Sequence, residues 1–223
     1  MNWAASRTER MTETDMRKHL ILAGGGHAHM TVLENIRAFV DKGVKVTVIG
    51  PSDYHYYSGM GPGMLGGTYS PDDIRFATRR VVQSQGGIFV RDRVDRIDPG
   101  EKVLHTLSGN TFTYDLISFN AGSHVPMDRL VRDGDNIYPV KPIEKLMEAA
   151  DKLSALFREK KIHVSVAGGG PSSAEVAGNV WQLARKIRGH MPDITIFAGK
   201  QFMARFPESV RTRVIRNLTS RGI

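Results

Sequence analysis

The chain has 223 residues, of which 40% are hydrophobic and 24% are charged, and its formal net charge is +8. This composition is typical of globular proteins and is sufficient for one large or two small domains. The sequence contains no cysteine, which excludes disulfides, thiolate metal sites and any dithiol redox centre. The positive charge favours anionic partners. No basic run is interleaved with stacking aromatic residues, and we therefore expect no nucleic-acid partner.

The first 17 residues, MNWAASRTERMTETDMR, lack the apolar core of a signal peptide, and their three acidic residues argue against a transit peptide. We predict that residues 1–17 form a disordered tail. No stretch of the sequence approaches the roughly 18 apolar residues of a membrane span. We therefore expect a cytoplasmic protein, with peripheral contact to the inner membrane face as an alternative.

A strand, a helix and a second strand are predicted directly after this tail. Residues 18–23 form a short apolar run that ends in glycines, as a buried parallel strand does. Residues 44–50, VKVTVIG, alternate as the next strand, after Gly43 has ended the helix. The apolar residues of that helix share one face: Met30, Leu33, Ile36 and Val40.

The same pattern returns later in the chain. We predict a strand over residues 163–167, a helix over 172–188 and a strand over 194–198. HLILAGGGHAHMTVL, which begins at His19, aligns at one constant offset with HVSVAGGGPSSAEVAGNV, which begins at His163. The repeat predicts an α/β fold with two Rossmann-like units, the second truncated at its C-terminus.

Between the two units the sequence changes character. Residues 53–69 are predicted to be a glycine-rich loop with four tyrosines, followed by a helix that Ser70 caps. Short strands are predicted over residues 87–105. A further buried strand is predicted over residues 114–126, and an amphipathic helix over residues 142–161.

Each unit places glycines where its first strand passes into its helix. Such a turn exposes backbone amides at the positive end of a helix, which is a favourable position for a pyrophosphate. The first glycine permits the tight turn and the second lets phosphates approach the backbone. Gly24 and Gly26 have these positions in the first unit, and Gly168 and Gly170 have them in the second. The usual third glycine is replaced by His29 and by Ser173, and we expect His29 to pack or hydrogen-bond where the glycine is usual.

Three further stretches carry a family resemblance. GGGPSSAEVAG resembles a nicotinamide-nucleotide motif in which a glutamate, here Glu175, lies seven residues after the first glycine. TYDLISFNAGSHVP resembles a second FAD motif, and RVDRID resembles the strand whose backbone meets the adenine of FAD. The chain over residues 18–223 thus resembles the two-dinucleotide-binding-domain flavoproteins of the pyridine nucleotide-disulfide oxidoreductase superfamily.

GGGHAHMTVL and YYSGMGPGMLGGTYSPDDI are most similar to the NADH-dehydrogenase-like group and to the modules associated with selenide water dikinase. The resemblance implies that residues 18–140 form an incomplete FAD-binding Rossmann domain, that 141–161 form a connecting helix, and that 162–223 form a truncated NAD(P)-binding domain. We expect an N-terminal fragment of a longer protein, inactive by itself.

The resemblance implies an oxidoreductase that transfers a hydride from NAD(P)H to FAD and passes electrons to an unknown acceptor, a quinone or a protein. Disulfide reductases and sulfide:quinone oxidoreductases work through cysteines near the flavin, and this chain has none. Because the chemistry belongs to the flavin, we expect no catalytic side chain. We also expect no metal site, since His27 and His29 diverge at the helix start.

The residues expected to bind the two cofactors lie at the glycine turns, at the strand ends beside them and on the adenine strand. Ser52, or alternatively Asp53, is the residue left at the ribose position, and Lys200 either meets a 2′-phosphate of NADPH or is a surface lysine. The full set is Gly24, Gly26, His27, Ala28, Ser52, Val94, Asn120, Ala121, Gly122, Gly168, Gly170, Pro171, Ser172, Glu175 and Lys200.

Two other interpretations stay open at this point. The chain could be a non-catalytic nucleotide-binding or redox-sensing module that accompanies selenide water dikinase. It could also be a peripheral membrane quinone reductase whose basic surface meets anionic lipid. A homodimer is compatible with all three interpretations.

Overall fold

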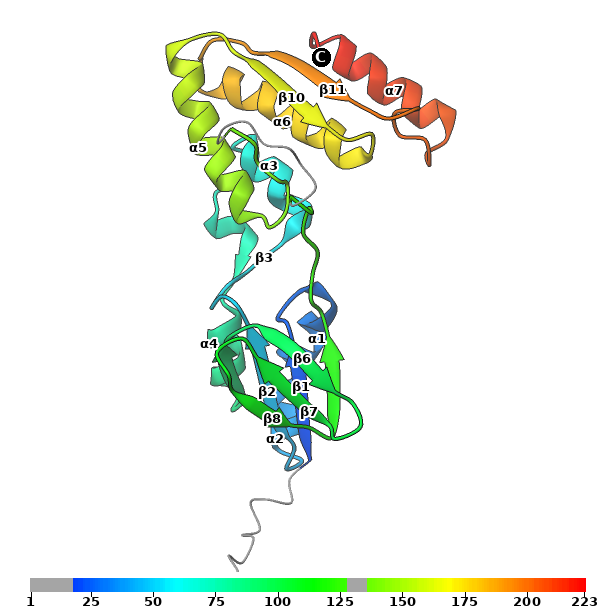
Figure 1. Cartoon of the computed structure of the whole chain (residues 1–223). Helices are drawn as coiled ribbons and strands as arrows, with labels where there is room; N and C mark the ends of the chain where they lie inside the picture. Colours follow the sequence, from blue (N-terminus) through cyan, green and yellow to red (C-terminus); the bar gives the residue numbers. More distant parts are fainter. Residues whose placement is uncertain (1–17, 128–135) are drawn as a thin grey trace, which may run out of the picture. The chain divides into compact units, whose positions relative to one another are not determined.

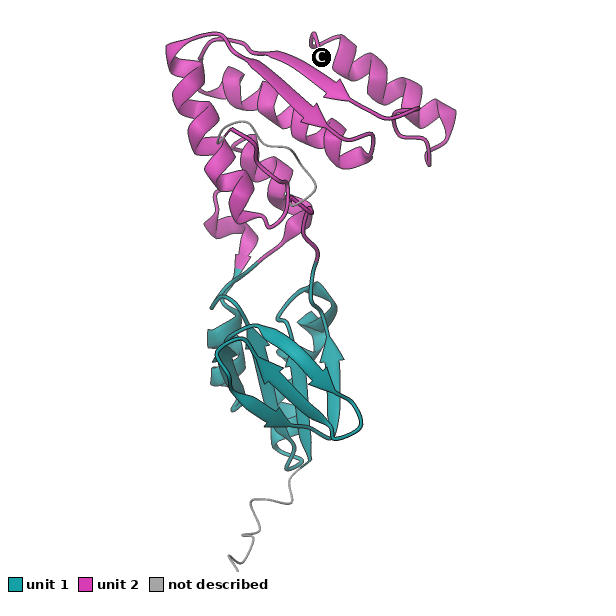
Figure 2. Cartoon of the chain, in the orientation of Figure 1, with its two compact units in different colours: residues 1–55, 76–122 teal, residues 56–75, 123–223 magenta. Residues whose placement is uncertain are grey.

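A computed structural model describes residues 18–127 and 136–223, so the tail predicted for residues 1–17 lies outside the described residues. The described chain forms two compact units (Figure 2). The first comprises residues 18–55 and 76–122, and the second comprises residues 56–75, 123–127 and 136–223. The prediction of an α/β fold with two Rossmann-like units is confirmed, because each unit has parallel strands joined through helices.

The first unit is built on a sheet of four parallel strands in the order β5-β2-β1-β9 (Figure 1). Its strands and helices, in chain order, are β1 (His19–Ala23), the 3-10 turn η2 (His27–His29), α1 (Met30–Glu34), α2 (Ile36–Val40), β2 (Lys45–Gly50), α4 (Thr78–Ser84), β5 (Ile88–Arg91) and β9 (Leu116–Phe119).

All five residues of β1 are buried, as the apolar run predicted. The predicted helix that follows is present but interrupted at Asn35, whose side-chain amide donates to the Thr31 carbonyl oxygen over 2.7 Å. This local hydrogen bond competes with the helical pattern. One core cluster of the unit packs Leu33 and Ile36 against strand residues such as Val48.

An antiparallel sheet of three strands precedes β9 in the sequence: β6 (Val94–Asp98), β7 (Val103–Thr106) and β8 (Thr111–Thr113). The prediction of a long buried strand over 114–126 is wrong in extent and in burial. β9 has four residues, and the side chains of Leu116 and Phe119 are 63% and 48% exposed. The reason is its position, because β9 is an edge strand of the four-stranded sheet.

The second unit contains two parallel strands, β10 (His163–Ala167) and β11 (Asp193–Phe197), with Ala167 paired to Phe197. Its longer helices are α5 (Glu144–Glu159), α6 (Pro171–Lys186) and α7 (Glu208–Thr219). The predicted strands and helices of this region are confirmed to within two residues.

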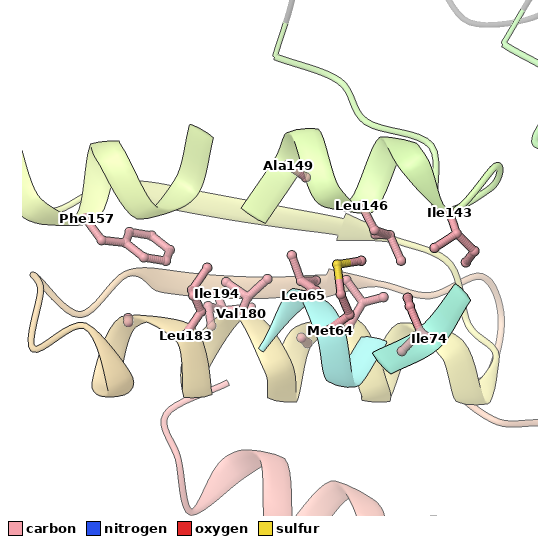
Figure 3. Close-up of a cluster of buried hydrophobic side chains, with 13 residues drawn as sticks. Met64, Leu65, Ile74, Ile143, Leu146, Ala149, Phe157, Val180, Leu183 and Ile194 are labelled. Atoms are coloured by element: carbon pink, nitrogen blue, oxygen red, sulfur yellow. The ribbon is translucent and has the colours of Figure 1, made fainter. Parts of the chain in front are cut away.

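The segment predicted as a loop over residues 53–69 is instead partly folded. It contains β3 (His55–Tyr56), the 3-10 turn η3 (Ser58–Met60) and the short helix α3 (Gly61–Leu65). Met64 and Leu65 point into the space between α5 and α6, where they join a core that includes Phe157 (Figure 3). The prediction of a loop failed because the many glycines of this segment obscure the pattern of its two adjacent core residues, Met64 and Leu65.

The helix predicted after Ser70 is a single 3-10 turn, η4 (Asp72–Ile74), followed by β4 (Arg75–Phe76), which pairs with β3. Ser70 does act as a cap, because its hydroxyl accepts the Asp73 N–H over 3.3 Å, while its own N–H and hydroxyl donate to the Asp73 carboxylate over 2.8 and 2.7 Å. These bonds lower the pKa of Asp73. Pairing of Arg75 and Phe76 with β3 ends the helical turn.

His19 is a buried polar residue on β1. Its Nδ1 donates to the carbonyl oxygen of Thr113 over 2.7 Å, and its Nε2 accepts from the Thr47 hydroxyl over 2.8 Å. Burial lowers the pKa of His19 below its ordinary value of 6.5, and Lys45 contributes in the same direction. The neutral ring therefore joins β1 to β2 and to the end of β8.

We expect this ring to make folding stability depend on pH. Because the folded pKa lies below 6.5, the unfolded chain binds the proton first as the pH falls. The stabilisation is complete above 6.5 and is lost as the pH falls from 6.5 through the folded pKa. Chemical denaturation at about pH 7.5 and about pH 5.5 should show a larger loss of unfolding free energy for the wild type than for His19→Gln.

The carboxyl groups with lowered pKa, Asp73, Asp92 and Asp115, have an ordinary value of 3.8 and titrate below this window. Equal losses in the wild type and in His19→Gln would contradict the prediction.

Candidate functional site

The first glycine turn begins where β1 ends. Gly24 has a φ of +101°, a conformation that side chains rarely adopt. Its N–H donates to the Ile49 carbonyl oxygen over 2.8 Å, which holds the turn against β2. A Cβ on Gly24 would overlap the carbonyl oxygen of Asn120. Glycine is therefore required at this position both by the backbone conformation and by the available space.

Asn120 is held beside this turn from the neighbouring strand. It directly follows β9, and its backbone N–H donates to the Ala23 carbonyl oxygen over 2.8 Å. A Cβ on Gly26 would lie 2.6 Å from Asn120 Nδ2, and one on Gly25 would lie 2.6 Å from Thr78 Cγ2. The structure thus brings together three predicted residues, Gly24, Gly26 and Asn120, and adds Thr78, which the sequence did not indicate.

Two polar atoms at this turn lack a partner. Among the described residues, the buried side-chain atoms without a hydrogen-bond partner are Asn120 Nδ2 and Thr78 Oγ1. Both belong to the residues that lie against Gly25 and Gly26. A buried polar atom without a partner is costly and uncommon in folded proteins. Their shared location indicates a polar group that comes from outside the protein.

His29 occupies the position of the usual third glycine. It is buried, and its Nδ1 lies 2.6 Å from the Gly24 carbonyl oxygen, which can only accept. In the neutral ring its Nε2 accepts from the Ser118 hydroxyl over 2.9 Å. The prediction that His29 packs or hydrogen-bonds in place of a glycine is confirmed. The histidine fastens the turn to β9.

The end of β2 differs from the usual acidic pattern. Ser52 accepts the Tyr54 N–H over 3.2 Å, and the Asp53 carboxylate is paired with Arg79 at 3.2 Å. Arg79 also lies 5.9 Å from the centre of the Phe89 ring. Arg79 thus lies on an exposed helix face, where an ion pair and a ring contact hold its guanidinium.

A hollow of about 350 Å³ lies at this end of β2. Its lining residues are Asp53, Tyr54, Ala77, Arg79, Arg80, Gln83 and Ser84. In dinucleotide-binding folds the adenosine ribose lies beyond the end of the second strand. Arg79 engages Asp53, and Ser52 does not line this hollow, so a ribose contact by Ser52 stays a prediction.

The second glycine turn repeats the backbone design in the second unit. Gly168 has a φ of +144° and donates its N–H to the Phe197 carbonyl oxygen over 2.9 Å. A Cβ on Gly168 would lie 2.7 Å from Ser173 Oγ, so the small Ser173 lets α6 approach β10 closely. A Cβ on Gly170 would meet nothing within 4 Å. The space above the start of α6 is therefore open.

The loop after β11 is tied to this second turn. The Met203 N–H donates to the Gly169 carbonyl oxygen over 2.6 Å, and a Cβ on Gly169 would lie 3.4 Å from Ala198. Lys200 is exposed on this loop. Pro171 and Ser172 begin α6, and Glu175 is exposed one turn later.

The remaining predicted residues of the first unit lie in η2, directly after β9 and at the start of β6. His27 and Ala28 are exposed in η2, and Ala121 and Gly122 follow Asn120 with exposed backbone. Val94 begins β6 on the antiparallel sheet and packs against a small core that includes Ile21. The cofactor-binding role of each predicted residue stays a prediction.

The described residues contain neither a metal-binding cluster nor a membrane-spanning helix. Residues 18–127 and 136–223 contain no group of three or more histidines and acidic residues placed to hold a metal ion. Within the same residues, no helix is both long enough and apolar enough to pass through a membrane.

The geometry of the first turn predicts that Gly24→Ala destabilises the protein strongly. Both the positive φ and the overlap with Asn120 oppose the added methyl group, and we expect a loss of more than about 2 kcal/mol of unfolding free energy. The matched variant Gly170→Ala has a φ of −95° and open space, so it should change stability by less than about 1 kcal/mol. Chemical denaturation of both variants checks this, and similar losses in the two would contradict it.

The chain is similar to several known proteins over its described length. A sulfide:quinone oxidoreductase from Dictyostelium discoideum is 25% identical over 135 residues, which are 58% of this chain and 29% of the relative. A type II NADH:quinone oxidoreductase from Staphylococcus saprophyticus is 27% identical over 107 residues, which are 48% of this chain and 26% of the relative. The matches thus span less than a third of these relatives.

The fold is similar to the crystal structure of the sulfide:quinone oxidoreductase from Aquifex aeolicus, with a TM-score of 0.72 and 19% identity. That similarity covers 92% of this chain and 50% of the other. Residues 18–223 match the family described as pyridine nucleotide-disulphide oxidoreductase, whose cofactors are FAD and NAD(P)H. The expected resemblance is confirmed, and the chain belongs to the pyridine nucleotide-disulphide oxidoreductase family.

Proposed function

We propose that the chain is the nucleotide-binding part of an FAD-dependent NAD(P)H oxidoreductase. The first unit binds FAD at the turn around Gly24 and Gly26, and the second binds NAD(P)H at the turn around Gly168 and Gly170. Family membership supports the enzyme class. The single observation that carries the assignment of FAD to the first unit is the pair of unpartnered buried atoms, Asn120 Nδ2 and Thr78 Oγ1.

These two atoms are suited to hydrogen bonds with the pyrophosphate of a dinucleotide. Asn120 Nδ2 can only donate, and a phosphate oxygen is a strong acceptor. The side chains of Asn120 and Thr78 already fill the space that a Cβ on Gly26 or Gly25 would need, so the backbone there must stay bare. The exposed backbone of Ala121 and Gly122 continues along the same edge.

The second unit offers a longer helix to its ligand. α6 has 16 residues and begins at Pro171, directly after the open position at Gly170. Its amino end carries a partial positive charge, which favours the pyrophosphate of a nicotinamide nucleotide. Lys200, on the loop fastened to Gly169, supports a preference for NADPH, because no carboxylate stands in the Ala198-Gly199-Lys200 stretch.

The flavin, when bound, supplies the redox chemistry by accepting a hydride and releasing electrons to an acceptor. The residues of the chain bind and orient the nucleotides, and none of them acts as a nucleophile or a general base. This chain supplies no redox-active disulfide, because its sequence contains no cysteine.

The acceptor best supported is a quinone. Both curated relatives are quinone oxidoreductases by name. A quinone acceptor would place the protein at a membrane surface, and the net charge of +8 favours the anionic inner face. A protein acceptor and a non-catalytic role beside selenide water dikinase are alternatives that flavin reduction by NAD(P)H and its reversal by a quinone separate.

Anaerobic reduction of the FAD-loaded protein, prepared at its full natural length, tests the proposal. Addition of NADH or NADPH should bleach the flavin absorption, more readily with NADPH, and a soluble quinone should restore it. Bleaching without restoration by a quinone would favour a protein acceptor. A chain that holds FAD but is not bleached by either nucleotide would contradict the enzyme proposal and favour the non-catalytic module.

Asn120→Asp should weaken FAD binding. The new carboxylate replaces a donor that has no protein partner and repels the pyrophosphate, so we expect the Kd for FAD to rise about tenfold or more. Asn35→Asp makes the same change of charge elsewhere in the first unit and should leave the Kd within about twofold. Fluorescence titration with FAD measures both, and equal effects would show that Asn120 does not contact the cofactor.

Gly170→Ala should weaken NAD(P)H binding specifically. Its methyl group would occupy the open space above the start of α6, so we expect an increase of about tenfold or more in the Kd for NADPH. Gly178→Ala in the same helix would meet only Arg221 at 3.5 Å and serves as the control. Isothermal titration calorimetry measures both, and unchanged binding by Gly170→Ala would place the nucleotide elsewhere.

A further inference from the structure

A second basic hollow lies in the second unit, away from the glycine turn. Its volume is about 270 Å³, and it is lined by Arg158, Arg188, Gly189 and His190. Arg158 is near the end of α5, and the other three residues follow the end of α6. The hollow therefore lies toward the amino ends of β10 and β11, whereas the turn at Gly168 follows the carboxyl end of β10.

Backbone contacts build this hollow. The His190 N–H donates to the Phe157 carbonyl oxygen over 2.6 Å, and a Cβ on Gly189 would lie 2.6 Å from the same oxygen. Phe157 is itself a fully buried residue of the core. The loop after α6 is thus fixed against the end of α5, and three basic side chains are held around one space.

No acidic residue lines the hollow. Among the described residues, neither Arg158 nor Arg188 forms an ion pair, and Arg158 donates to the carbonyl oxygen of Ser154 in its own helix. The nearby Lys161, by contrast, is paired with Asp193 at 2.8 Å. Positive charges held together without a carboxylate repel one another, and a bound anion would relieve that repulsion.

The backbone at Arg188 gives a second, independent observation. Its φ is +53°, in the left-handed region that glycine normally occupies after a helix. A glycine would fit this position without strain, and the next residue is a glycine. An arginine at this position therefore costs backbone strain that a glycine would avoid. Arg188 thus combines a strained backbone with a side chain that forms no ion pair with a described residue.

We propose that this hollow binds the phosphoryl group of a phosphorylated small molecule. The planar guanidinium groups of Arg158 and Arg188 match the oxygens of a phosphoryl group in pairs, and the exposed His190 supplies a further ring nitrogen. The volume exceeds that of one phosphate ion and leaves room for the group that carries it. The proposal does not rest on the proposed oxidoreductase function.

A titration of the full chain with inorganic phosphate tests this site. Two-dimensional amide NMR should show shifts of the Gly189 and His190 amides that saturate, with sodium chloride used to keep the ionic strength constant. Arg188→Gly removes the guanidinium and relieves the backbone strain, so the variant should fold at least as well as the wild type. We expect its affinity for phosphate at these amides to fall about tenfold or more.

Lys152→Gln is the matched control, because it removes one exposed positive charge from α5 at a residue that does not line the hollow. It should leave the affinity within about twofold. Vesicles of phosphatidylglycerol identify the source of the phosphoryl group: competition with phosphate for the same amides would indicate a lipid headgroup, and no competition a soluble molecule. Amides that do not shift, or that shift equally in Arg188→Gly, would overturn the proposal.

Discussion

The structure of the first unit depends on one constraint, the close passage of backbone at the point where the buried strand β1 turns into a helix. At Gly24 the neighbouring chain is so near that a single added carbon would overlap the Asn120 carbonyl oxygen. The hydrogen bonds from Gly24 to β2 and from Asn120 to β1 hold three parallel strands together at this level. The bare backbone that results is also the surface best suited to phosphates.

The two turns meet this constraint in different ways. In the first unit the buried His29 bonds both to the turn and to Ser118 of β9, so the helix start is fastened to a neighbouring strand. In the second unit the smaller Ser173 lets α6 lie close to β10, and the position at Gly170 stays open. Polar side chains thus already surround the first turn, whereas the space at the second turn is open. This difference agrees with the proposal of a tightly held FAD at the first turn and an exchanging NAD(P)H at the second.

The regular strands and helices could be predicted because their apolar residues have clear periods. β10 and the strand–helix–strand order of both units follow directly from that pattern. The helix α3 could not be predicted, because Gly61 and Gly63 conceal Met64 and Leu65, whose burial depends on α5 and α6. The exposure of β9 depends on its place at the edge of the sheet, which no local pattern records.

The same distinction applies to the candidate site. Glycine spacing indicated Gly24, Gly26, Gly168 and Gly170, because the turn itself requires those residues. Thr78 and the ion pair of Arg79 with Asp53 could not be found from spacing, since they join residues distant in the sequence through the fold. A threonine at the start of a short helix has no signature of its own.

The central claim is that one chain binds two different nucleotides at two separate glycine turns. Equilibrium titration of the chain with FAD, followed by titration of the FAD complex with NADPH, tests it most directly. The account predicts one FAD and one NADPH for each chain, without competition between them. Competition for a single site, or binding of only one of the two nucleotides, would contradict it.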